Sequence, residues 1–459
     1  MNRLTVCVQG LGFVGAAMSV ATARAGHQVI GLDLDTESGR QRADALNRGE
    51  FPFATTDASL QAAARAAHTA GRLHATTDAR ALATADIVVV DVNLDLVLSG
   101  NGAASPHFAP FEAAIDMIGQ HAKPGALVLV ESTVPPGTCE RVVRPILDRQ
   151  AVTRGLPVGT LLLAHSYERV MPGADYLASI TQYWRVFAGE TTVAAQRCRA
   201  FLESVVDTQA YPLTELSSMT ASETAKVLEN TFRATTIALM EEWGRFAETV
   251  GVDLFEVISA IRQRPTHANI RQPGFGVGGY CLTKDPLMAG AAARELFGIP
   301  TMPFPFSEAA VRTNAEAPRT SVDRLAQLLH GLTGRRILLL GVAYRQDVSD
   351  TRFSPSEPFV REAEARGAHV HSHDPLVTHW HELDRTVSTV LPQPEADAVV
   401  LAVPHAMYRQ IDITTWLGER RPLLFDANAV LTTRQIEHCR TLGVPLWIVG
   451  RGLVTPEAT

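Results

Sequence analysis

Short apolar runs alternate with helical stretches along most of the chain. In the first half the apolar runs occupy residues 4–9, 28–32, 85–92, 126–130 and 161–164. In the last third they occupy residues 335–340, 369–373, 398–403 and 423–426. Continuous apolar runs of this length are typical of parallel strands that are buried on both faces. The helical stretches between them include residues 16–25, 61–71 and 356–366. The alternation predicts an α/β fold with two Rossmann-like, doubly wound domains.

The middle of the chain has a helical period instead. Residues 213–250 contain few helix breakers, and Leu228, Phe232, Thr235 and Leu239 recur at steps of three and four residues. This pattern predicts one long helix that joins the two domains and offers a surface for a homodimer. The proline-bearing residues 303–318 are interpreted as the passage into the last domain.

Three polar residues of the predicted long helix, Lys226, Asn230 and Arg233, follow one another at helical spacing and share a face. A solvated charged face and a polar stripe that faces a ligand both explain them. The predicted domains are an N-terminal Rossmann-like domain over 1–210, a central helical dimerisation domain over 211–310, and a C-terminal α/β domain over 311–459.

A dinucleotide site is predicted at the first strand. The strand runs into a glycine turn and an alanine-rich helix, and the second strand ends at Asp33. Glycines permit a tight turn and close approach of a pyrophosphate, and the helix N-terminus supplies N–H donors. Asp33 suits a free ribose 2′-hydroxyl, so NAD is favoured over NADP. The alternative is a tight βα turn without a ligand. The residues predicted to bind the cofactor here are Gly10, Gly12, Phe13, Val14, Gly15 and Asp33.

Polar residues also follow other predicted strands, where open α/β sheets bind ligands. Thr133 comes after the strand at 126–130 and is a candidate hydroxyl near the nicotinamide, or else an N-cap of the next helix. Glu168 follows the strand at 161–164 and is expected to face the same cleft. In the last third, Arg345 and Arg352 follow a strand and suit phosphate groups, although surface charge also explains them.

The stretch Gln272 to Pro286 combines glycines with reactive side chains. Its glycines precede Cys281, and Lys284 and Asp285 follow. A thiol beside a cation and a carboxylate is a candidate nucleophile with acid/base groups of its own. A flexible loop with a structural cysteine is the simpler interpretation.

Composition narrows the function classes. The 459 residues are 46% hydrophobic and 19% charged, with a net charge of −7, which makes a nucleic-acid or anionic-membrane surface unlikely. The five cysteines are scattered without a CxxC pair, so neither a disulfide framework nor a structural metal site is expected. A reducing cytoplasm is the expected compartment. No targeting segment and no membrane-spanning apolar run is recognised.

Several motifs together resemble the UDP-glucose/GDP-mannose dehydrogenase family of nucleotide-sugar dehydrogenases. They are, in the family's order, GLGFVG, ESTVPPGT, YERVMPG, ASETAKVLENTFRA, PGFGVGGYCLTKDP and GVAYRQDVSDTRFSP. The resemblance covers nearly the whole chain. The ERVMPG segment looks more like the branch that oxidises UDP-N-acetylhexosamines, whereas GGYC also occurs in UDP-glucose dehydrogenases.

The resemblance implies roles for matching residues. Cys281 is then the nucleophile and Lys226 approaches the sugar O6. Asn230 and Asp285 handle water, and Glu168 is an acid/base. Thr133 and Arg352 approach NAD. The residues implied to contact the nucleotide sugar are Arg169, Val170, Lys226, Asn230, Arg233, Gly278, Tyr344 and Arg345, together with either Arg264 or His267.

The sequence also departs from the family pattern. Asn93-Leu94-Asp95 replaces Pro-Thr-Pro, Tyr167 and Thr283 replace prolines, and Arg345 replaces a lysine. These departures indicate an uncommon branch, in which the sugar can differ.

The implied reaction is a two-step oxidation of a sugar C6 alcohol to the carboxylate, with two NAD reduced, for polysaccharide precursor biosynthesis. The alternatives are a UDP-glucose or GDP-mannose 6-dehydrogenase, a one-step β-hydroxyacid-type dehydrogenase, and a catalytically silent nucleotide-sugar-binding protein. Counting NADH per substrate separates the two-step from the one-step class.

Overall fold

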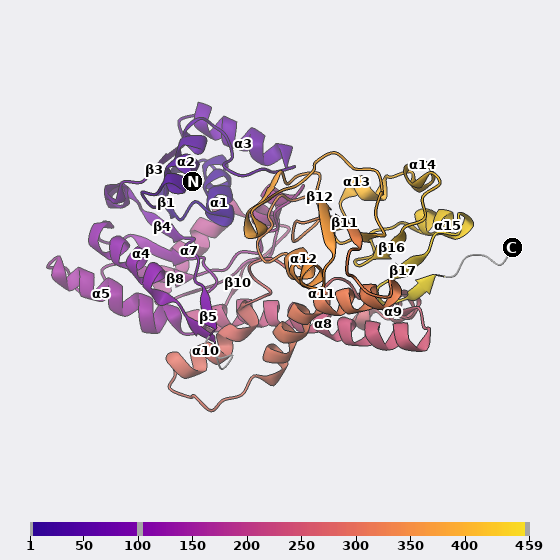
Figure 1. The fold of residues 1–459 in the computed structure, drawn as a ribbon. Coiled ribbons are helices and arrows are strands. Elements are labelled where there is room, and N and C mark those ends of the chain that lie inside the picture. The colour runs from indigo at the N-terminus through magenta and orange to yellow at the C-terminus, as the bar shows by residue number, and fades with distance from the viewer. Residues whose placement is uncertain (1–2, 99–103, 455–459) are drawn as a thin grey trace. The chain divides into compact units, whose positions relative to one another are not determined.

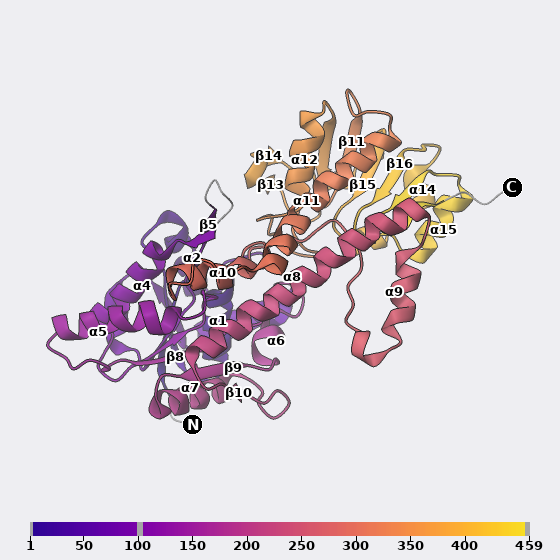
Figure 2. The same ribbon diagram turned by 90° about the horizontal axis from the view of Figure 1, so that it is seen from below.

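The computed structural model describes residues 3–98 and 104–454, so the outermost ends of the first and last predicted domains lie outside the described residues. The chain divides into two compact units. Unit 1 comprises Met1–Glu229 and Leu287–Phe304, and unit 2 comprises Asn230–Pro286 and Pro305–Thr459. The boundary at Glu229 falls inside the helix α8 (Met219–Val250), which Figure 2 shows as one continuous helix.

Unit 1 is built on an eight-stranded sheet of order β10-β9-β8-β7-β4-β1-β2-β3. Its pairs are parallel except for β8 with β9. The strands are β1 (Thr5–Gln9), β2 (Gln28–Leu32), β3 (Leu73–Thr76), β4 (Ile87–Val90), β7 (Leu127–Val130), β8 (Leu162–His165), β9 (Val186–Gly189) and β10 (Thr214–Glu215). Two further strands, β5 (Leu96–Leu98) and β6 (Ala104–Pro106), pair antiparallel.

Both faces of this sheet are buried, as the continuous apolar runs predict. Val6 and Val8 of β1 contribute to one core, and Cys7 between them contributes to the other. Helices flank both faces (Figure 1). The first core is closed by α1 (Phe13–Arg24), α2 (Glu37–Asn47), α3 (Ala58–Thr69), α6 (Tyr176–Thr181) and α7 (Thr192–Val205). The second is closed by η1 (Ala79–Thr84), α4 (Phe108–His121), η2 (Cys139–Val143) and α5 (Arg144–Thr153). Unit 1 also contains α10 (Met288–Glu295).

Unit 2 repeats the plan with a six-stranded sheet of order β12-β11-β15-β16-β17-β18. Only β17 and β18 pair antiparallel in it. The strands are β11 (Arg336–Leu340), β12 (His369–His373), β15 (Ala398–Leu401), β16 (Leu423–Asp426), β17 (Leu446–Ile448) and β18 (Gly452–Val454). A short antiparallel pair, β13 (His379–Trp380) and β14 (Arg385–Thr386), lies outside this sheet.

Helices again cover both faces of the sheet. The core that contains Ile337 and Leu339 includes α11 (Pro305–Leu328) and α12 (Ser356–Ala365). The core that contains Leu338 and Leu340 includes α13 (Ala406–Arg409), α14 (Ile413–Leu417) and α15 (Thr433–Thr441). Unit 2 also holds α9 (Leu254–Arg262), η3 (Pro265–His267) and η5 (His381–Leu383), while η4 (Asp285–Leu287) crosses the unit boundary. The predicted fold class, two Rossmann-like doubly wound units and a long helix, is confirmed.

Two predicted segments differ from the structure. The boundary between the units at 304/305 falls inside the predicted passage over residues 303–318, but most of this passage is the helix α11, with Pro318 inside it. Ala310, Ala317 and Val322 on this helix are buried, and that packing outweighs the hydrogen bond that a proline removes. The long helix begins at Met219 rather than at residue 213, since Thr214 and Glu215 pair with β9.

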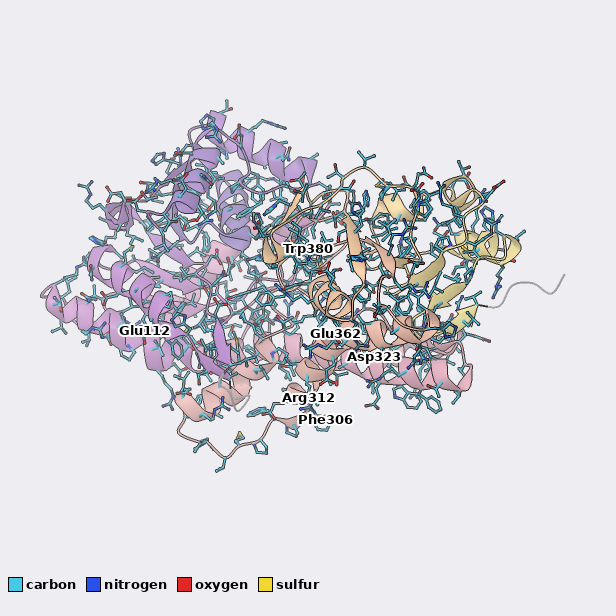
Figure 3. The ribbon with its side chains drawn as sticks, viewed as in Figure 1. Glu112, Phe306, Arg312, Asp323, Glu362 and Trp380 are labelled. Carbon is cyan, nitrogen blue, oxygen red and sulfur yellow. The ribbon has the colours of Figure 1, made fainter. Side chains whose placement is uncertain are left out.

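Helices α11 and α12 are also joined by charge. The Arg366 guanidinium lies 2.7 Å from Asp323 and 2.8 Å from Glu362, and Figure 3 labels both acids. Within the described part of the chain, no helix is long and apolar enough to cross a membrane.

Candidate active site

The turn after β1 has the geometry that its glycines predict. Gly10 has φ 96°, and a Cβ there would stand 2.5 Å from the carbonyl oxygen of Asp91. A Cβ on Gly15 would stand 1.9 Å from the carbonyl oxygen of Gly10. Gly12 begins α1 without a side-chain cap and faces open space. Phe13 and Val14 lie in the first turn of α1, and a helix N-terminus favours an anionic ligand such as a pyrophosphate.

Asp33 closes β2 beside this turn. Its carboxylate accepts hydrogen bonds from the backbone N–H of Leu11 at 3.3 Å and of Leu34 at 2.8 Å. Arg42 of α2 donates to the same carboxylate at 2.8 Å. The sequence interpretation missed Arg42, although an arginine one helix beyond the acidic residue is a visible signal. The turn, the open helix end and Asp33 together fit a dinucleotide.

The half-buried Asp91 follows β4 and the buried Glu131 follows β7, both at the carboxyl edge of the same sheet. Glu131 lies 2.5 Å from the Arg185 guanidinium, and both side chains are buried. Burial, and then repulsion from Glu131 and Glu168, raise the pKa of Asp91 well above its usual range. The positive charge of Arg185 acts in the opposite direction and lowers the pKa of Asp91. Sequence analysis did not single out Asp91 or Arg185.

Thr133 is half-buried after β7. The next helical segment begins at Cys139 and has Thr138 at its N-cap position, so Thr133 is not the cap of that helix. Its approach to the nicotinamide stays a prediction.

Glu168, the predicted acid/base, and Lys226, the lysine predicted to approach the sugar O6, lie together in unit 1. The Lys226 ammonium donates to the backbone carbonyl of Glu168 at 2.7 Å and lies 3.4 Å from its carboxylate. Both side chains are buried. The backbone N–H of Val170 donates to the other carboxylate oxygen of Glu168. Two groups of opposite charge are thus held against each other at the end of β8.

Arg169 is held by groups that sequence reasoning missed. Its Nε donates to Glu229 at 3.0 Å and its Nη2 at 2.9 Å. Burial acts to raise the pKa of Glu229, but Arg169 outweighs it and lowers that pKa. The buried Tyr167 ring lies between two cations, with Arg169 at 5.0 Å and the Lys226 ammonium at 5.5 Å from its centroid. Tyr167, which replaces a family proline, therefore contacts both of these functional candidates.

Cys281 differs from the other four cysteines because it is exposed and they are buried. Its carbonyl oxygen accepts hydrogen bonds from the N–H of Lys284 at 3.2 Å and of Asp285 at 2.9 Å. The Asp285 carboxylate is fully buried and accepts from the Asn230 amide at 2.7 Å and from the Lys284 ammonium at 2.8 Å. Unit 2 therefore brings Asn230, Lys284 and Asp285 together next to Cys281.

The loop after β11 packs on the glycines of the cysteine stretch. A Cβ on Gly279 would stand 2.8 Å from the Tyr344 ring, and one on Gly278 would stand 2.7 Å from the Phe353 carbonyl oxygen. Burial, followed by the charges of Asp350 and Cys281, raises the pKa of Tyr344 to about 12. Glycine is thus required at both positions for this loop to approach Cys281.

The two arginines of this loop differ in their surroundings. Arg352 forms a bidentate pair with Asp350, at 3.0 Å from Nε and 2.7 Å from Nη2. Arg345 is exposed. Whether they contact phosphate or NAD stays a prediction.

Arg233 and His267 are exposed residues of unit 2. Burial, and repulsion from Arg233 and Arg262, lower the pKa of Arg271, so these three guanidinium groups are crowded. Sequence analysis missed Arg262 and Arg271. Arg264 is exposed as well, so exposure does not distinguish it from His267.

Within the described residues, no group of histidine, cysteine, aspartate and glutamate side chains could hold a metal ion.

Three models of one family match the chain. The NAD binding domain of the UDP-glucose/GDP-mannose dehydrogenase family matches residues 4–206, the central domain matches 220–316, and the UDP binding domain matches 338–433.

Individual relatives cover most of the chain. A UDP-N-acetyl-D-mannosamine dehydrogenase of Pyrococcus horikoshii is 29% identical over 414 residues, 89% of this chain and 91% of that protein. An NDP-N-acetyl-D-galactosaminuronic acid dehydrogenase of Ralstonia nicotianae is 27% identical over 421 residues, 89% of this chain and 92% of that protein. The solved structure of a UDP-D-ManNAc dehydrogenase from P. horikoshii superposes with a TM-score of 0.82 at 26% identity, covering 98% of this chain and 100% of that one.

Proposed function

The chain belongs to the UDP-glucose/GDP-mannose dehydrogenase family, and on that premise we propose that it oxidises the C6 hydroxyl of a UDP-N-acetylhexosamine to the carboxylate with two molecules of NAD. One observation carries the proposal of a covalent route. Cys281 is the exposed cysteine, and its carbonyl oxygen accepts a hydrogen bond from the backbone N–H of Asp285, whose carboxylate is buried. The N-acetylated sugars in the names of the two relatives support the choice of substrate.

The first half of the reaction requires loss of the O6 proton. Lys226 places a cation beside the developing alkoxide, and Glu168, which Lys226 contacts, accepts the proton through ordered water. Bound NAD supplies the hydride acceptor. Gly10, Gly12 and Gly15 would hold its pyrophosphate, and Asp33 its adenosine ribose. Thr133 is assigned to the nicotinamide side of the site.

The second half uses the thiol. The Cys281 sulfur adds to the C6 aldehyde and forms a thiohemiacetal, whose oxidation gives a thioester. Water then attacks the thioester carbonyl, which breaks the C–S bond and releases the carboxylate and the thiol. Asp285 and Asn230 hydrogen-bond to each other at 2.7 Å and are the groups assigned to position that water. The bound adduct keeps the reactive aldehyde from escaping.

Nucleotide recognition is assigned to basic and aromatic groups. Arg169, Val170, Arg233, Gly278, Tyr344 and Arg345 are the proposed contacts to the nucleotide sugar, with Arg352 approaching NAD. The crowding of Arg233 with Arg262 and Arg271 supports an anionic ligand there, because bound phosphate would relieve the repulsion. We propose that residues 1–210 form the NAD-binding domain, 211–310 the central helical dimerisation domain, and 311–459 the nucleotide-sugar-binding domain.

A homodimer through α8 is proposed from one apolar face of that helix. Its exposed residues recur at helical spacing: Leu228, Phe232, Leu239, Trp243, Phe246 and Val250. Such a stripe on a solvent-facing helix is typical of a protein interface. We also assign the enzyme to the cytoplasm, because a thiol nucleophile requires reducing conditions, and to polysaccharide precursor synthesis.

A substrate panel tests the function. Purified enzyme is given NAD and, in turn, UDP-GlcNAc, UDP-GalNAc, UDP-ManNAc, UDP-glucose and GDP-mannose, and NADH is counted per sugar consumed. We expect two NADH per molecule of an N-acetylated UDP-sugar and a uronic acid product. One NADH per sugar would favour a one-step dehydrogenase, and none with any sugar would favour a silent binding protein.

A further inference from the structure

Phe353 has an unfavourable conformation in the loop between β11 and α12. Its backbone φ is 55°, in the left-handed region that bulky residues rarely adopt. Its side chain is 52% exposed, so burial of the ring does little to offset the strain. A residue that is both strained and exposed is better explained by ligand binding than by stability.

The ring of Phe353 lies against the cysteine loop. Its centroid is 6.1 Å from that of Tyr280, with the two planes inclined by 51°. Tyr280 immediately precedes Cys281 in the chain. The Phe353 backbone also packs on Gly278, where a Cβ would stand 2.7 Å from its carbonyl oxygen. An aromatic pair therefore stands next to the proposed nucleophile.

The position of Tyr280 is fixed by the acid/base groups of the same loop. The Lys284 ammonium lies 4.3 Å from the centroid of the Tyr280 ring. Lys284 in turn lies 2.8 Å from the buried Asp285 carboxylate. The aromatic pair is thus anchored to the groups that surround Cys281, and it would be ordered before a substrate binds.

The position next to Cys281 limits which part of a nucleotide sugar can meet these rings. The thiol must reach C6, so the sugar lies beside residue 280, and ribose and diphosphate separate the base from C6. An unsubstituted hexose offers mainly hydroxyls, which lose hydrogen bonds to water against an apolar surface. An acetamido group offers a methyl group and a planar amide, which gain from contact with an aromatic ring.

We infer that Tyr280 and Phe353 form an aromatic surface that contacts the acyl substituent of the sugar and so selects N-acylated over unsubstituted hexoses. This inference rests on the proposed function and names the residues that determine its specificity.

The variant Phe353→Asn tests the inference. Asparagine tolerates the left-handed conformation, so the change removes the ring and relieves the strain together. We measure kcat/KM for UDP-GlcNAc, UDP-GalNAc, UDP-ManNAc and UDP-glucose, and the thermal midpoint Tm. For the preferred N-acetylated sugar, the ratio of kcat/KM to that of UDP-glucose should fall about tenfold. Tm should stay level or rise by about 1–4 °C. A lower Tm with equal loss for all sugars would show a structural role and overturn the inference.

Two further variants complete the design. His330→Asn changes another exposed residue of left-handed φ, 56°, which follows α11, and should leave the sugar ratio unchanged. Tyr280→Leu removes the other ring. Like Phe353→Asn, it should lower the ratio of kcat/KM for the N-acetylated sugar to kcat/KM for UDP-glucose. A wild-type enzyme that reduces no NAD with any N-acetylated sugar contradicts the proposed function. A wild-type enzyme that oxidises such a sugar, with an unchanged ratio in Phe353→Asn, contradicts this inference alone.

Discussion

The turn after β1 in unit 1 and the turn after β11 in unit 2 begin alike and end differently. Each opens on a glycine of positive φ, 96° at Gly10 and 100° at Gly341. In both, a Cβ would collide with the chain after a neighbouring strand, at 2.5 Å from the Asp91 carbonyl oxygen and 2.4 Å from the Val403 Cβ. In unit 1 the helix starts at Phe13, whereas in unit 2 it starts only at Ser356.

The longer turn is held by its own side-chain contacts. Asp374 accepts hydrogen bonds from the N–H of Val342 at 2.9 Å and of Ala343 at 3.2 Å, and His405 accepts one from Asp347 at 2.9 Å. These backbone donors are therefore not available to a ligand. Unit 1 offers a ligand the backbone at a helix end, while unit 2 offers side chains on a folded loop. The same strand–turn–helix plan therefore presents different groups at its turn in the two units.

The largest effect is expected from the proposed nucleophile, which lies in unit 2. Cys281→Ser should reduce uronic acid formation by about 10³-fold or more, because the thioester route is lost. NAD affinity, which belongs to the turn of unit 1, should not change. Product analysis and a fluorescence titration with NAD measure the two quantities. Acid formation at the wild-type rate would exclude the covalent route.

The next variant changes Lys226, which lies in unit 1 but outside the glycine turn of that unit. Lys226→Ala should lower kcat by about 10²-fold or more, because the developing alkoxide loses its cation. NAD binding should persist. Lys123→Ala, which removes an ion pair with Asp86 at 2.5 Å, is the matched lysine control and should retain turnover. If Lys226→Ala and the wild type have equal turnover, the role assigned to Lys226 is wrong.

The variant Asp33→Ala tests whether unit 1 determines the preference for NAD over NADP. This change frees Arg42 from its pair with Asp33, so a 2′-phosphate gains a guanidinium partner. The preference for NAD over NADP, as a ratio of kcat/KM values, should fall about tenfold, with KM for the nucleotide sugar unchanged. The double variant Asp33→Ala/Arg42→Ala should lose the gain with NADP. If Asp33→Ala keeps the wild-type preference for NAD over NADP, Asp33 does not bind the ribose 2′-hydroxyl.

The last prediction concerns stability rather than activity, at the side chain that accepts a hydrogen bond from the cysteine stretch. Glu241 of α8 accepts from the N–H of Gly274 at 3.1 Å, and burial raises the pKa of Glu241 to about 8 from 4.5. The folded state keeps this proton while the unfolded chain releases it, so stability should decline as pH rises from about 4.5 to 8. The decline is at most about 1.4 kcal/mol per pH unit.

Glu241→Gln keeps an acceptor but cannot titrate, so its urea midpoint should depend less on pH over that range. Midpoints of both proteins at pH 6 and pH 8 make the comparison. Parallel pH profiles would show that Glu241 is ionised in the folded protein throughout.

The features that sequence predicts here are local ones. The glycine turn, Asp33 and the strands at 28–32, 369–373 and 423–426 depend on neighbouring residues, and the structure has those strands at the predicted bounds. The family resemblance assigned a common role to Asn230 and Asp285, but their hydrogen bond was not predicted.

The sequence does not predict contacts between residues that are far apart in the chain. Glu229 holds Arg169, and Glu131 meets Arg185, across long stretches of chain with no pattern to connect them. The helix at α11 was missed because local proline content opposed it while buried packing favoured it. The strain at Phe353 has no sequence signal, since phenylalanine in a loop is ordinarily unremarkable.

The continuity of α8 also sets a rule for insertions and deletions. A helix turns by roughly 100° per residue, so one residue inserted after Asn230 would swing the face that carries Phe232, Leu239 and Trp243 away from its present direction. A surface loop absorbs such a change at little cost. The direction of this apolar face therefore depends on the number of residues in α8. Changes of length there should be far less tolerated than changes of side chain.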